Sequence, residues 1–304
     1  MSDKIQHLLN NQLKDWDTAR NNYEALNGVK TKALSVNDCE FNVQFNPARI
    51  VSSGAKVDAK SIQERKCFLC ADNRPKEQTG LDFGENYTIL VNPFPIFPKH
   101  FTIPEKSHVP QTIISRFDDM LDLAEFMGDY VIFYNGPKCG ASAPDHAHFQ
   151  AGNKGFLPLE KNWEKHIAKK LSEKLSVINY VFSAFLIETD NKAEAVSLFD
   201  KIYHSLTINE GEIEPMMNVL AWRNNKKWVA VIIPRAKHRP DCYFAEGEEN
   251  MLISPASVDL GGVFITPIEK DFEKINEKNI EAILQEVCFD KNNFQKIIEE
   301  FLSK

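Results

Sequence analysis

Apolar residues recur every three or four positions in several segments of the chain, which is the spacing of one face of a helix. The first such segment runs from Ile5 to Tyr23. A second, from Ile113 to Leu123, predicts a helix over roughly 110–128. Further helices are expected over residues 159–175, 193–206, 271–287 and 291–302.

Shorter apolar runs lie between these segments and are typical of β-strands. A hairpin is expected where two such runs, 217–223 and 228–234, flank Asn224-Asn225. One more strand is expected to carry His146 and His148 after a glycine-bearing loop. The other predicted strands cover residues 41–51, 87–91, 101–104, 131–134 and 178–187.

Two short segments of the chain resemble each other. FTIPEKSH (101–108) and VIIPRAKH (231–238) each consist of an apolar strand, a proline, a basic residue and a histidine. Glycine-containing segments follow both, CGAS from Cys139 and DLGG from Asp259. Such self-similarity is a sign of duplicated domains, although a match this short also arises by chance. The second copy has no His-x-His, so we expect it to be catalytically silent.

Composition and charge narrow the class of protein. With 43% hydrophobic and 26% charged residues among 304, the chain has the composition of a soluble globular protein with enough apolar residues for a core. A net charge of −7 argues against a general nucleic-acid binder, because phosphate backbones require a basic face. No apolar run approaches the roughly 20 residues that span a bilayer, and the polar N-terminal pattern differs from a signal sequence. We therefore expect a cytoplasmic protein without a membrane or nucleic-acid partner.

The cysteines point to metal binding rather than to disulfides. Cys67 and Cys70 form a C-x2-C motif that supplies two thiolates on one turn, a common half-site for zinc. A redox role requires a thioredoxin-like βαβ setting, which the surrounding loop does not provide. Two unrelated thiols are the remaining alternative. Buried thiols are the simplest interpretation of the other cysteines, namely Cys39, Cys139, Cys242 and Cys288.

The segment HAHFQ places three polar side chains at alternate positions. In a strand, residues two apart point to the same face, so His146, His148 and Gln150 are predicted to line one surface. Ala147 and Phe149 then face the core. A half-exposed strand with incidental histidines is the alternative, but three aligned polar groups after a Gly/Ser loop favour a functional site.

Residues 134–152, YNGPKCGASAPDHAHFQAG, resemble the active-site segment of the histidine-triad superfamily. The segment is similar above all to the transferase branch, which contains galactose-1-phosphate uridylyltransferase, diadenosine tetraphosphate phosphorylase and GDP-hexose phosphorylases. The resemblance covers the first half of the chain well and the second in outline. It implies an α+β fold of two histidine-triad-like halves, with antiparallel sheets and packed helices. Residues 1–154 would form the catalytic half and residues 155–304 a degenerate half.

The resemblance also implies a mechanism. His148 would attack the α-phosphorus of a nucleotide, with its other ring nitrogen held by a backbone carbonyl. Gln150 would donate to a phosphoryl oxygen, and the backbone around Gly140, Ala141 and Ser142 would cradle phosphate. Hydrolases of the superfamily carry a third histidine where this chain has Gln150. Because glutamine cannot titrate, it suits a good leaving group such as a phosphate, whose second pKa is about 6.

Two classes of donor fit these residues equally: a nucleotide sugar, with phosphate or a sugar 1-phosphate as acceptor, or a dinucleoside polyphosphate. We expect the nucleotide sugar, because the cysteine pair and His108 are shared with the uridylyltransferases. In that group His108 and His146 complete the metal site, which implies a structural zinc at Cys67, Cys70, His108 and His146, or iron at the same site. A non-catalytic nucleotide-binding module and a zinc-stabilised interaction protein are the alternatives from other classes.

Further residues are expected near the substrate. Arg49 follows Asn-Pro-Ala in a segment similar to one that approaches the nucleotide phosphates, although a surface salt bridge is as good an interpretation. In NPFP (92–95), Asn92 would bond the sugar hydroxyls and Phe94 would pack on the base, unless the segment is only a turn. Asn135 belongs to the phosphate loop. Lys99 and His100 are expected to be a solvated basic pair, and Asp145 has no expected catalytic role. The basic cluster Arg235, Lys237, His238 and Arg239 would hold the acceptor phosphate, or be a solvated face.

Overall fold

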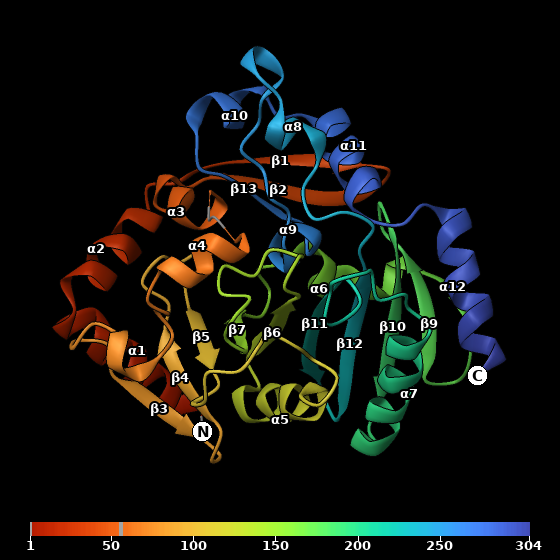
Figure 1. The fold of residues 1–304 in the computed structure, drawn as a ribbon, viewed down its shortest axis with the longest axis horizontal. Coiled ribbons are helices and arrows are strands. Elements are labelled where there is room, and N and C mark those ends of the chain that lie inside the picture. Colours follow the sequence, from red (N-terminus) through yellow and green to blue (C-terminus); the bar gives the residue numbers. More distant parts are fainter. Residues whose placement is uncertain (1, 55–56) are drawn as a thin grey trace.

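The computed structural model describes residues 2–54 and 57–304, and in this part of the chain ten strands form one antiparallel sheet (Figure 1). In chain order the strands are β3 (Gly80–Phe83), β4 (Tyr87–Val91), β5 (His100–Pro104), β6 (Tyr130–Asn135), β7 (His148–Asn153), β8 (Ile167–Lys170), β9 (Leu175–Asn179), β10 (Ser183–Thr189), β11 (Met217–Asn224) and β12 (Lys227–Pro234). Across the sheet their order is β3-β4-β5-β7-β6-β11-β12-β10-β9-β8.

This order reveals two halves with the same connectivity. In the first, β3, β4 and β5 lead into helix α5 (Phe117–Met127) and then into β6 and β7. In the second, β8, β9 and β10 lead into α7 (Lys192–His204) and then into β11 and β12. The halves meet where β6 pairs with β11, with Asn135 opposite Asn218. The predicted α+β class with two related halves is confirmed, but the halves share one continuous sheet.

The sequence match between 101–108 and 231–238 pairs the wrong strands. The first segment begins on β5, and the strand at the corresponding place of the second half is β10. The second segment begins on β12, which corresponds to β7. The duplication is therefore visible in the connectivity, whereas the similarity of the two peptides comes from a shared pattern of an apolar strand that ends in proline.

Each face of the sheet has its own hydrophobic core. One face packs against α1 (Ser2–Asp15), α5, α7 and α12 (Lys291–Ser303), and the rings of Phe117 and Phe199 stack with centroids 4.0 Å apart. The other face packs against a three-stranded sheet of β1 (Lys30–Val36), β2 (Cys39–Phe45) and β13 (Val263–Thr266), at the top of Figure 1, and against α11 (Glu277–Val287).

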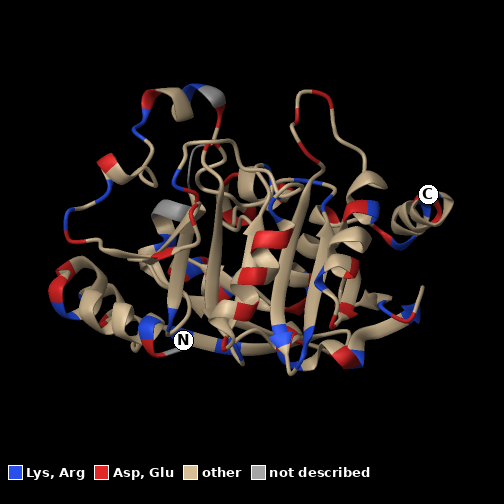
Figure 2. Cartoon of the chain, turned by 90° about the horizontal axis from the view of Figure 1, so that it is seen from below, with Lys and Arg blue, Asp and Glu red and all other residues tan. Residues whose placement is uncertain are grey.

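Alternate residues of β6 serve the two cores, as expected for a strand buried on both faces: Tyr130 and Ile132 belong to one, Val131 and Phe133 to the other. On the side of the molecule that carries α5, acidic and basic residues are interspersed (Figure 2). Lys192 of α7, for example, pairs with Asp118 and Asp122 of α5 at 2.6 and 2.7 Å.

Several predicted elements are shorter than expected, for local reasons. The strand predicted over 41–51 ends at Phe45, because Pro47 has no N–H to donate and begins a 3-10 turn. The N-terminal helix is two helices, α1 and α2 (Asp17–Leu26), separated at Trp16. The helix predicted over 110–128 begins only at Phe117. The helix predicted over 271–287 is divided into α10 (Glu269–Lys274) and α11, and Asn276 caps the second of these.

Two predictions in the second half are wrong. The charged helix over 159–175 is instead α6 (Pro158–Asn162), a 3-10 turn to His166 and then β8 at the edge of the sheet. The single strand over 178–187 is a hairpin of β9 and β10, with Asn179 opposite Ser183. By contrast, the hairpin predicted around Asn224-Asn225 is confirmed, and Asn225 adopts a φ of 55° in the turn. The remaining short helices are α3 (Ile50–Ser53), α4 (Ala59–Glu64), α8 (Asp241–Phe244) and α9 (Ser257–Leu260).

Within the described residues no helix combines the length and the apolar character that a membrane span requires.

Candidate active site

Strand β7 presents His148 and Gln150 on one face, because the two residues are two positions apart. The prediction that His146 shares this face is wrong. β7 begins at His148, so His146 lies in the loop before it, and its ring turns toward the cysteine loop. Gln150 pairs with Thr102 of β5 on one side and with Phe133 of β6 on the other, so it stands in the middle of the first half's sheet.

The ring of His148 has a defined tautomer. Its Nδ1 lies 2.8 Å from the backbone oxygen of His146. A carbonyl oxygen can only accept, so Nδ1 carries the proton and Nε2 keeps its lone pair. The side chain lines a cavity of about 1170 Å³. Burial lowers the pKa of His148 to about 4, so the imidazole is neutral at neutral pH.

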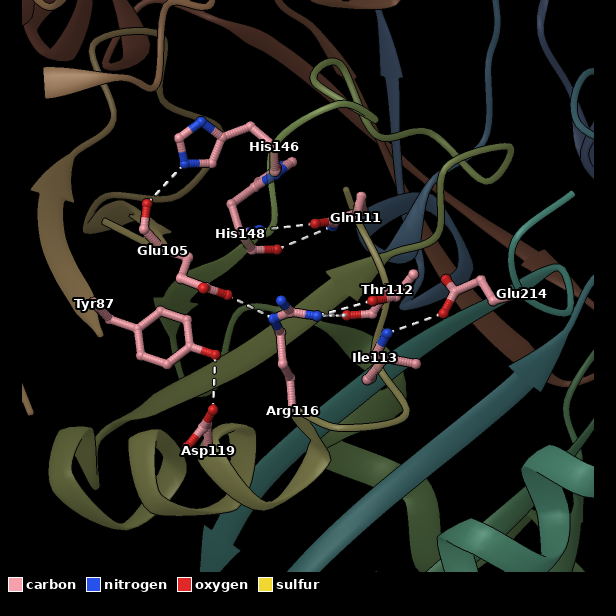
Figure 3. A network of polar contacts seen from close by, with 10 residues as sticks. All are labelled: Tyr87, Glu105, Gln111, Thr112, Ile113, Arg116, Asp119, His146, His148 and Glu214. Carbon is pink, nitrogen blue, oxygen red and sulfur yellow. Dashed lines mark hydrogen bonds and ion pairs between the residues drawn. The ribbon is translucent and has the colours of Figure 1, made fainter. Parts of the chain in front are cut away.

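The backbone of His148 is clamped by the fully buried side chain of Gln111 (Figure 3). The Gln111 Oε1 accepts from the His148 N–H at 2.7 Å, and Nε2 donates to the His148 carbonyl at 3.0 Å. The same Nε2 donates to the carbonyl of Asn135, at 2.9 Å. Two residues further along, the Ile113 N–H donates to Glu214 of the second half at 2.9 Å. The start of β7 is thus fixed by a segment that the second half holds.

The amide of Gln150 is oriented by His100. The Ile96 backbone N–H, which can only donate, points at Nδ1 of His100 over 3.1 Å. The proton of this imidazole therefore sits on Nε2, which donates to Oε1 of Gln150 at 3.0 Å. The NH2 group of Gln150 is consequently left for the cavity that Gln150 lines. His100 is fully buried, which lowers its pKa to about 3, so the prediction that it is solvated is wrong.

The loop between β6 and β7 borders a second, smaller cavity of about 60 Å³, and Ser142 lines both cavities. Gly140 and Ala141 line the smaller one. Gly140 has a φ of 96°, and a Cβ at this position would lie 2.5 Å from the Cβ of Ala256. The loop can approach the second half this closely only because residue 140 is a glycine.

Asn135 also borders the smaller cavity, but its oxygen is already engaged. Its Oδ1 accepts from the Asn218 side chain and from the Ser257 N–H, both at 2.9 Å. Both partners belong to the second half. Asn135 therefore ties the two halves together beside the site and has only its NH2 group left for a ligand.

Arg49, Asn92 and Phe94, predicted to meet the nucleotide, all line the larger cavity. Arg49 donates to the carbonyl of Phe94 at 2.8 Å. Burial lowers the pKa of Arg49 to about 10, so it remains charged at neutral pH. Asn92 donates to the Thr102 hydroxyl at 3.0 Å and accepts from the Phe94 N–H at 2.9 Å. These contacts hold the side chains at the cavity wall.

The four predicted metal ligands lie together. The ligand atoms of Cys67, Cys70, His108 and His146 are all within 4.8 Å of one another. The shortest contacts join Cys67 Sγ to His146 Nδ1 and Cys70 Sγ to His108 Nδ1, both at 3.2 Å. His146 Nε2 donates to the Glu105 carbonyl at 2.7 Å (Figure 3), so its Nδ1 lone pair faces the sulfur atoms. Two thiols and two imidazoles in this arrangement can hold a transition-metal ion.

Two family models together match most of the chain. One is described as a domain of unknown function (DUF4922) and matches residues 8–153; the other, GDPGP1-like C-terminal domain, matches residues 158–304. Galactose-1-phosphate uridylyltransferase of Halalkalibacterium halodurans is 26% identical over 172 residues, which are 50% of this chain and 34% of that protein. Protein APA1 of Saccharomyces cerevisiae is 25% identical over 259 residues, 73% of this chain and 77% of that one.

The chain is thus similar to a galactose-1-phosphate uridylyltransferase and to yeast Protein APA1, in line with the resemblance of its segment 134–152. The crystal structure of yeast Ap4A phosphorylase Apa2 has the same fold. The superposition covers 90% of this chain and 96% of the Apa2 chain, with a TM-score of 0.60 and 18% sequence identity. The chain spans only about a third of the length of the matched H. halodurans uridylyltransferase, at 34%.

The predicted basic cluster is divided by the fold. Arg235 is buried, and the oxygens that accept from its guanidinium include those of Val287 and Pro255, both at 3.0 Å. Lys237 forms ion pairs with Asp241 and Glu286. Neither residue lines a cavity described above, so the prediction that Arg235, Lys237 and His238 converge on one ligand is wrong. His238 and its neighbour Arg239 do line the smaller cavity.

Residues that the sequence did not mark as functional also shape the candidate site. Gln111 and Glu214 act through backbone groups, and their partners lie 37 and 101 residues away in sequence. His100 follows a proline-rich stretch that gives no periodic signal for burial.

Proposed function

We propose that this protein is a nucleotidyltransferase that transfers a nucleoside monophosphate from a nucleotide sugar to phosphate or to a sugar 1-phosphate, through a covalent adduct on His148. One observation carries the proposal: Nδ1 of His148 is bound to a backbone carbonyl, while the ring lines a cavity of about 1170 Å³. A neutral imidazole with a free Nε2 lone pair is a competent nucleophile toward phosphorus.

In the first step, the Nε2 lone pair attacks the α-phosphorus, and the bond from phosphorus to the bridging oxygen breaks. The electron pair of that bond leaves with the sugar 1-phosphate. In the second step, an oxygen of the acceptor phosphate attacks the same phosphorus, and the electron pair of the P–N bond returns to Nε2. Two successive displacements of this kind give ping-pong kinetics.

The surrounding groups suit this chemistry. The NH2 group of Gln150, oriented by His100, can donate to a non-bridging oxygen where charge is redistributed in the transition state. The hydroxyl of Ser142 borders the same cavity. Gln150 cannot donate a titratable proton, so the leaving group must depart as a stable anion, and a phosphate meets this requirement.

The larger cavity suits two classes of nucleotide donor. A cavity of about 1170 Å³ accommodates a nucleotide together with a second large group. Arg49 offers charge to the phosphates, while Asn92 and Phe94 offer contacts to the sugar and the base. A second candidate function is phosphorolysis of a dinucleoside polyphosphate. Its support is that the chain spans 77% of Protein APA1 and shares the fold of Ap4A phosphorylase Apa2.

We assign the metal cluster a structural role and propose zinc as its ion. Cys67, Cys70, His108 and His146 would bind it and join the cysteine loop to the segment before β7. The ion would fix this junction and take no part in the transfer. Because both thiols must stay reduced to bind a metal, we also propose a cytoplasmic location.

Intact-mass measurement tests the function directly. The protein is mixed with a panel of nucleotide sugars and dinucleoside polyphosphates, without any acceptor. We expect an acid-labile mass increase of one nucleoside monophosphate with the correct donor, and none in His148→Ala. The donor that reacts separates the two candidate functions. Tight binding of nucleotides without an adduct from any donor would instead support a non-catalytic binding module.

A further inference from the structure

The smaller cavity has the size of a small anion. Its volume is about 60 Å³, and Arg49, Ser142 and Gln150 border it as well as the larger cavity. One water requires about 10–15 Å³ of such space, so the cavity has room for about four oxygen atoms. It is too small for a base or a sugar. Whatever binds here must be compact and must lie beside the groups that face the reacting phosphorus.

The wall from the second half presents a fixed guanidinium. Arg239 lines the cavity, and its Nε donates to the Ser254 hydroxyl at 3.0 Å. The guanidinium carbon lies 4.2 Å from the ring centroid of Tyr243. Ser254 also lines the cavity. These two contacts restrain the side chain, so little entropy is lost when the guanidinium meets an oxyanion.

A buried positive charge adjoins this wall. Arg235 is only 2% exposed, and its guanidinium donates to the carbonyl of His238 at 3.0 Å and to the carbonyl of Pro255, also at 3.0 Å. All of its hydrogen-bond partners are neutral oxygens, and among the described residues no carboxylate pairs with it. Its charge is therefore hydrogen-bonded but not neutralised, which favours an anion nearby.

The pKa of one titratable group at the cavity is consistent with a positive potential. The pKa of His238 falls to about 3 because the ring is buried and because Arg239, Arg235 and Lys138 are close. The carboxyl group of Asp259 lines the cavity too, but its oxygens already accept from the N–H groups of Ala256 and Ile265, at 2.9 and 3.1 Å. With Arg49 and Arg239 on the wall and Arg235 behind it, positive groups outnumber the single carboxylate.

We propose that the smaller cavity is the phosphate subsite of the transfer reaction, in which Arg239 binds the phosphate group that leaves in the first step and attacks in the second. This inference rests on the proposed function. The leaving and the attacking phosphate must occupy one place, because the second displacement is the reverse of the first at the same phosphorus. The ligand is a phosphate oxyanion, either inorganic phosphate or the phosphate of a sugar ester.

The subsite gives the second half a chemical role. That half lacks a nucleophilic histidine, yet it provides His238, Arg239 and Ser254 to the cavity. The first half provides the nucleophile and the Gly140–Ser142 loop. Recognition of the acceptor would therefore depend on contact between the halves, which Gly140 permits by its close approach to Ala256.

Direct binding of inorganic phosphate to the full-length protein tests the subsite. Arg239→Gln removes the guanidinium, and Arg223→Gln is the matched control. The guanidinium carbon of Arg223 also lies over an aromatic ring, 4.0 Å from the ring centroid of Trp228, but Arg223 lines neither cavity. Calorimetry should show phosphate affinity reduced at least tenfold in Arg239→Gln and unchanged in Arg223→Gln. Ser254→Ala, which loosens Arg239 and removes one hydroxyl from the cavity wall, should reduce it about threefold. Equal affinity in wild type and Arg239→Gln would overturn the proposal.

Discharge of the adduct provides the second measurement. Inorganic phosphate and glucose 1-phosphate are each added to the nucleotidylated protein, and the faster acceptor identifies the source of the phosphate. For that acceptor, the concentration that gives half-maximal discharge should rise at least tenfold in Arg239→Gln, whereas nucleoside monophosphate binding should stay within twofold. An unchanged concentration would contradict the subsite. If no donor forms an adduct with wild type, nucleotidyl transfer fails, while calorimetry still decides whether the cavity binds phosphate.

Discussion

The imidazole of His100 and the amide of Gln150 form one oriented pair: the Ile96 N–H fixes the tautomer of His100, and His100 fixes which end of the Gln150 amide enters the cavity. An unrestrained glutamine could present either its oxygen or its NH2 group to a phosphoryl oxygen. Only the NH2 group stabilises the negative charge there. His100 is thus a positioning residue for Gln150.

Replacing His100 by asparagine should therefore slow adduct formation. The asparagine oxygen can still accept from the Ile96 N–H, but no group reaches Gln150. We expect about tenfold slower nucleotidylation with little change in nucleotide affinity, compared with about 100-fold for Gln150→Ala, the usual effect of losing one such donor. In the double variant the His100 effect should disappear, because the two residues act in series. Single-turnover mass measurements decide this, and additive losses would contradict the positioning role.

The same histidine should make stability depend on pH. Burial lowers the pKa of His100 to about 3, whereas an unfolded histidine titrates near 6.5. Between these values the unfolded chain binds a proton that the folded chain excludes, so stability falls as pH falls below about 6.5. The slope from this group approaches about 1.4 kcal/mol per pH unit. Urea unfolding from pH 7.5 to 4.5 should show a steeper loss for wild type than for His100→Asn; parallel curves would exclude His100 as the source.

The Gln111 clamp should matter for both stability and catalysis. Gln111→Leu fills a similar volume but leaves the His148 N–H and two carbonyls without their partner. A buried unsatisfied group costs about 1–3 kcal/mol, so the free energy of unfolding should fall by at least that amount, and adduct formation should slow because the start of β7 is released. The control is Gln285→Leu, an exposed glutamine on α11 whose side-chain amide donates to Glu281. That control should stay within about 0.5 kcal/mol of wild type.

Metal analysis of purified protein should give about one zinc per chain. Cys67→Ser should lose the metal together with stability, since binding free energy contributes to folding. Cys242→Ser, a half-buried cysteine outside the cluster, should retain both. A chelator should lower the Tm of wild type and leave that of Cys67→Ser unchanged. Metal-free protein with an unaltered Tm would rule out the structural ion.

Local sequence patterns predicted a helix or strand correctly where a single feature, such as an apolar run, dominates the segment. The β11–β12 hairpin follows from two apolar runs around a pair of asparagines, and β4 follows from YTILV alone. The charged stretch after Pro158 has helical composition, yet Ile167–Lys170 pairs with β9 at the sheet edge, where exposed lysines are tolerated. Tertiary pairing overrides propensity in such a segment.

The residues of the candidate site also differ in whether the sequence alone predicts them. His148, Gln150 and the cysteine pair lie in short motifs whose spacing indicates their expected chemistry, and the family resemblance adds His108 and His146 as expected metal ligands. His100, Gln111 and Arg239 contribute through partners that only the fold brings near. The sequence alone does not distinguish the roles of Arg235 and Arg239, because both belong to one basic cluster. One is buried among carbonyls and the other lines a cavity, because the chain turns between them.

The pairing of β6 with β11 has a consequence for any attempt to isolate the first half of the chain. A fragment that ends near residue 154 would expose one edge of β6, where residues 132–135 pair with β11 in the intact chain and all six residues of the strand are buried. Unpaired apolar edges recruit other strands, so such a fragment would self-associate or aggregate instead of working alone. The second half thus protects this edge of the first half in the intact chain.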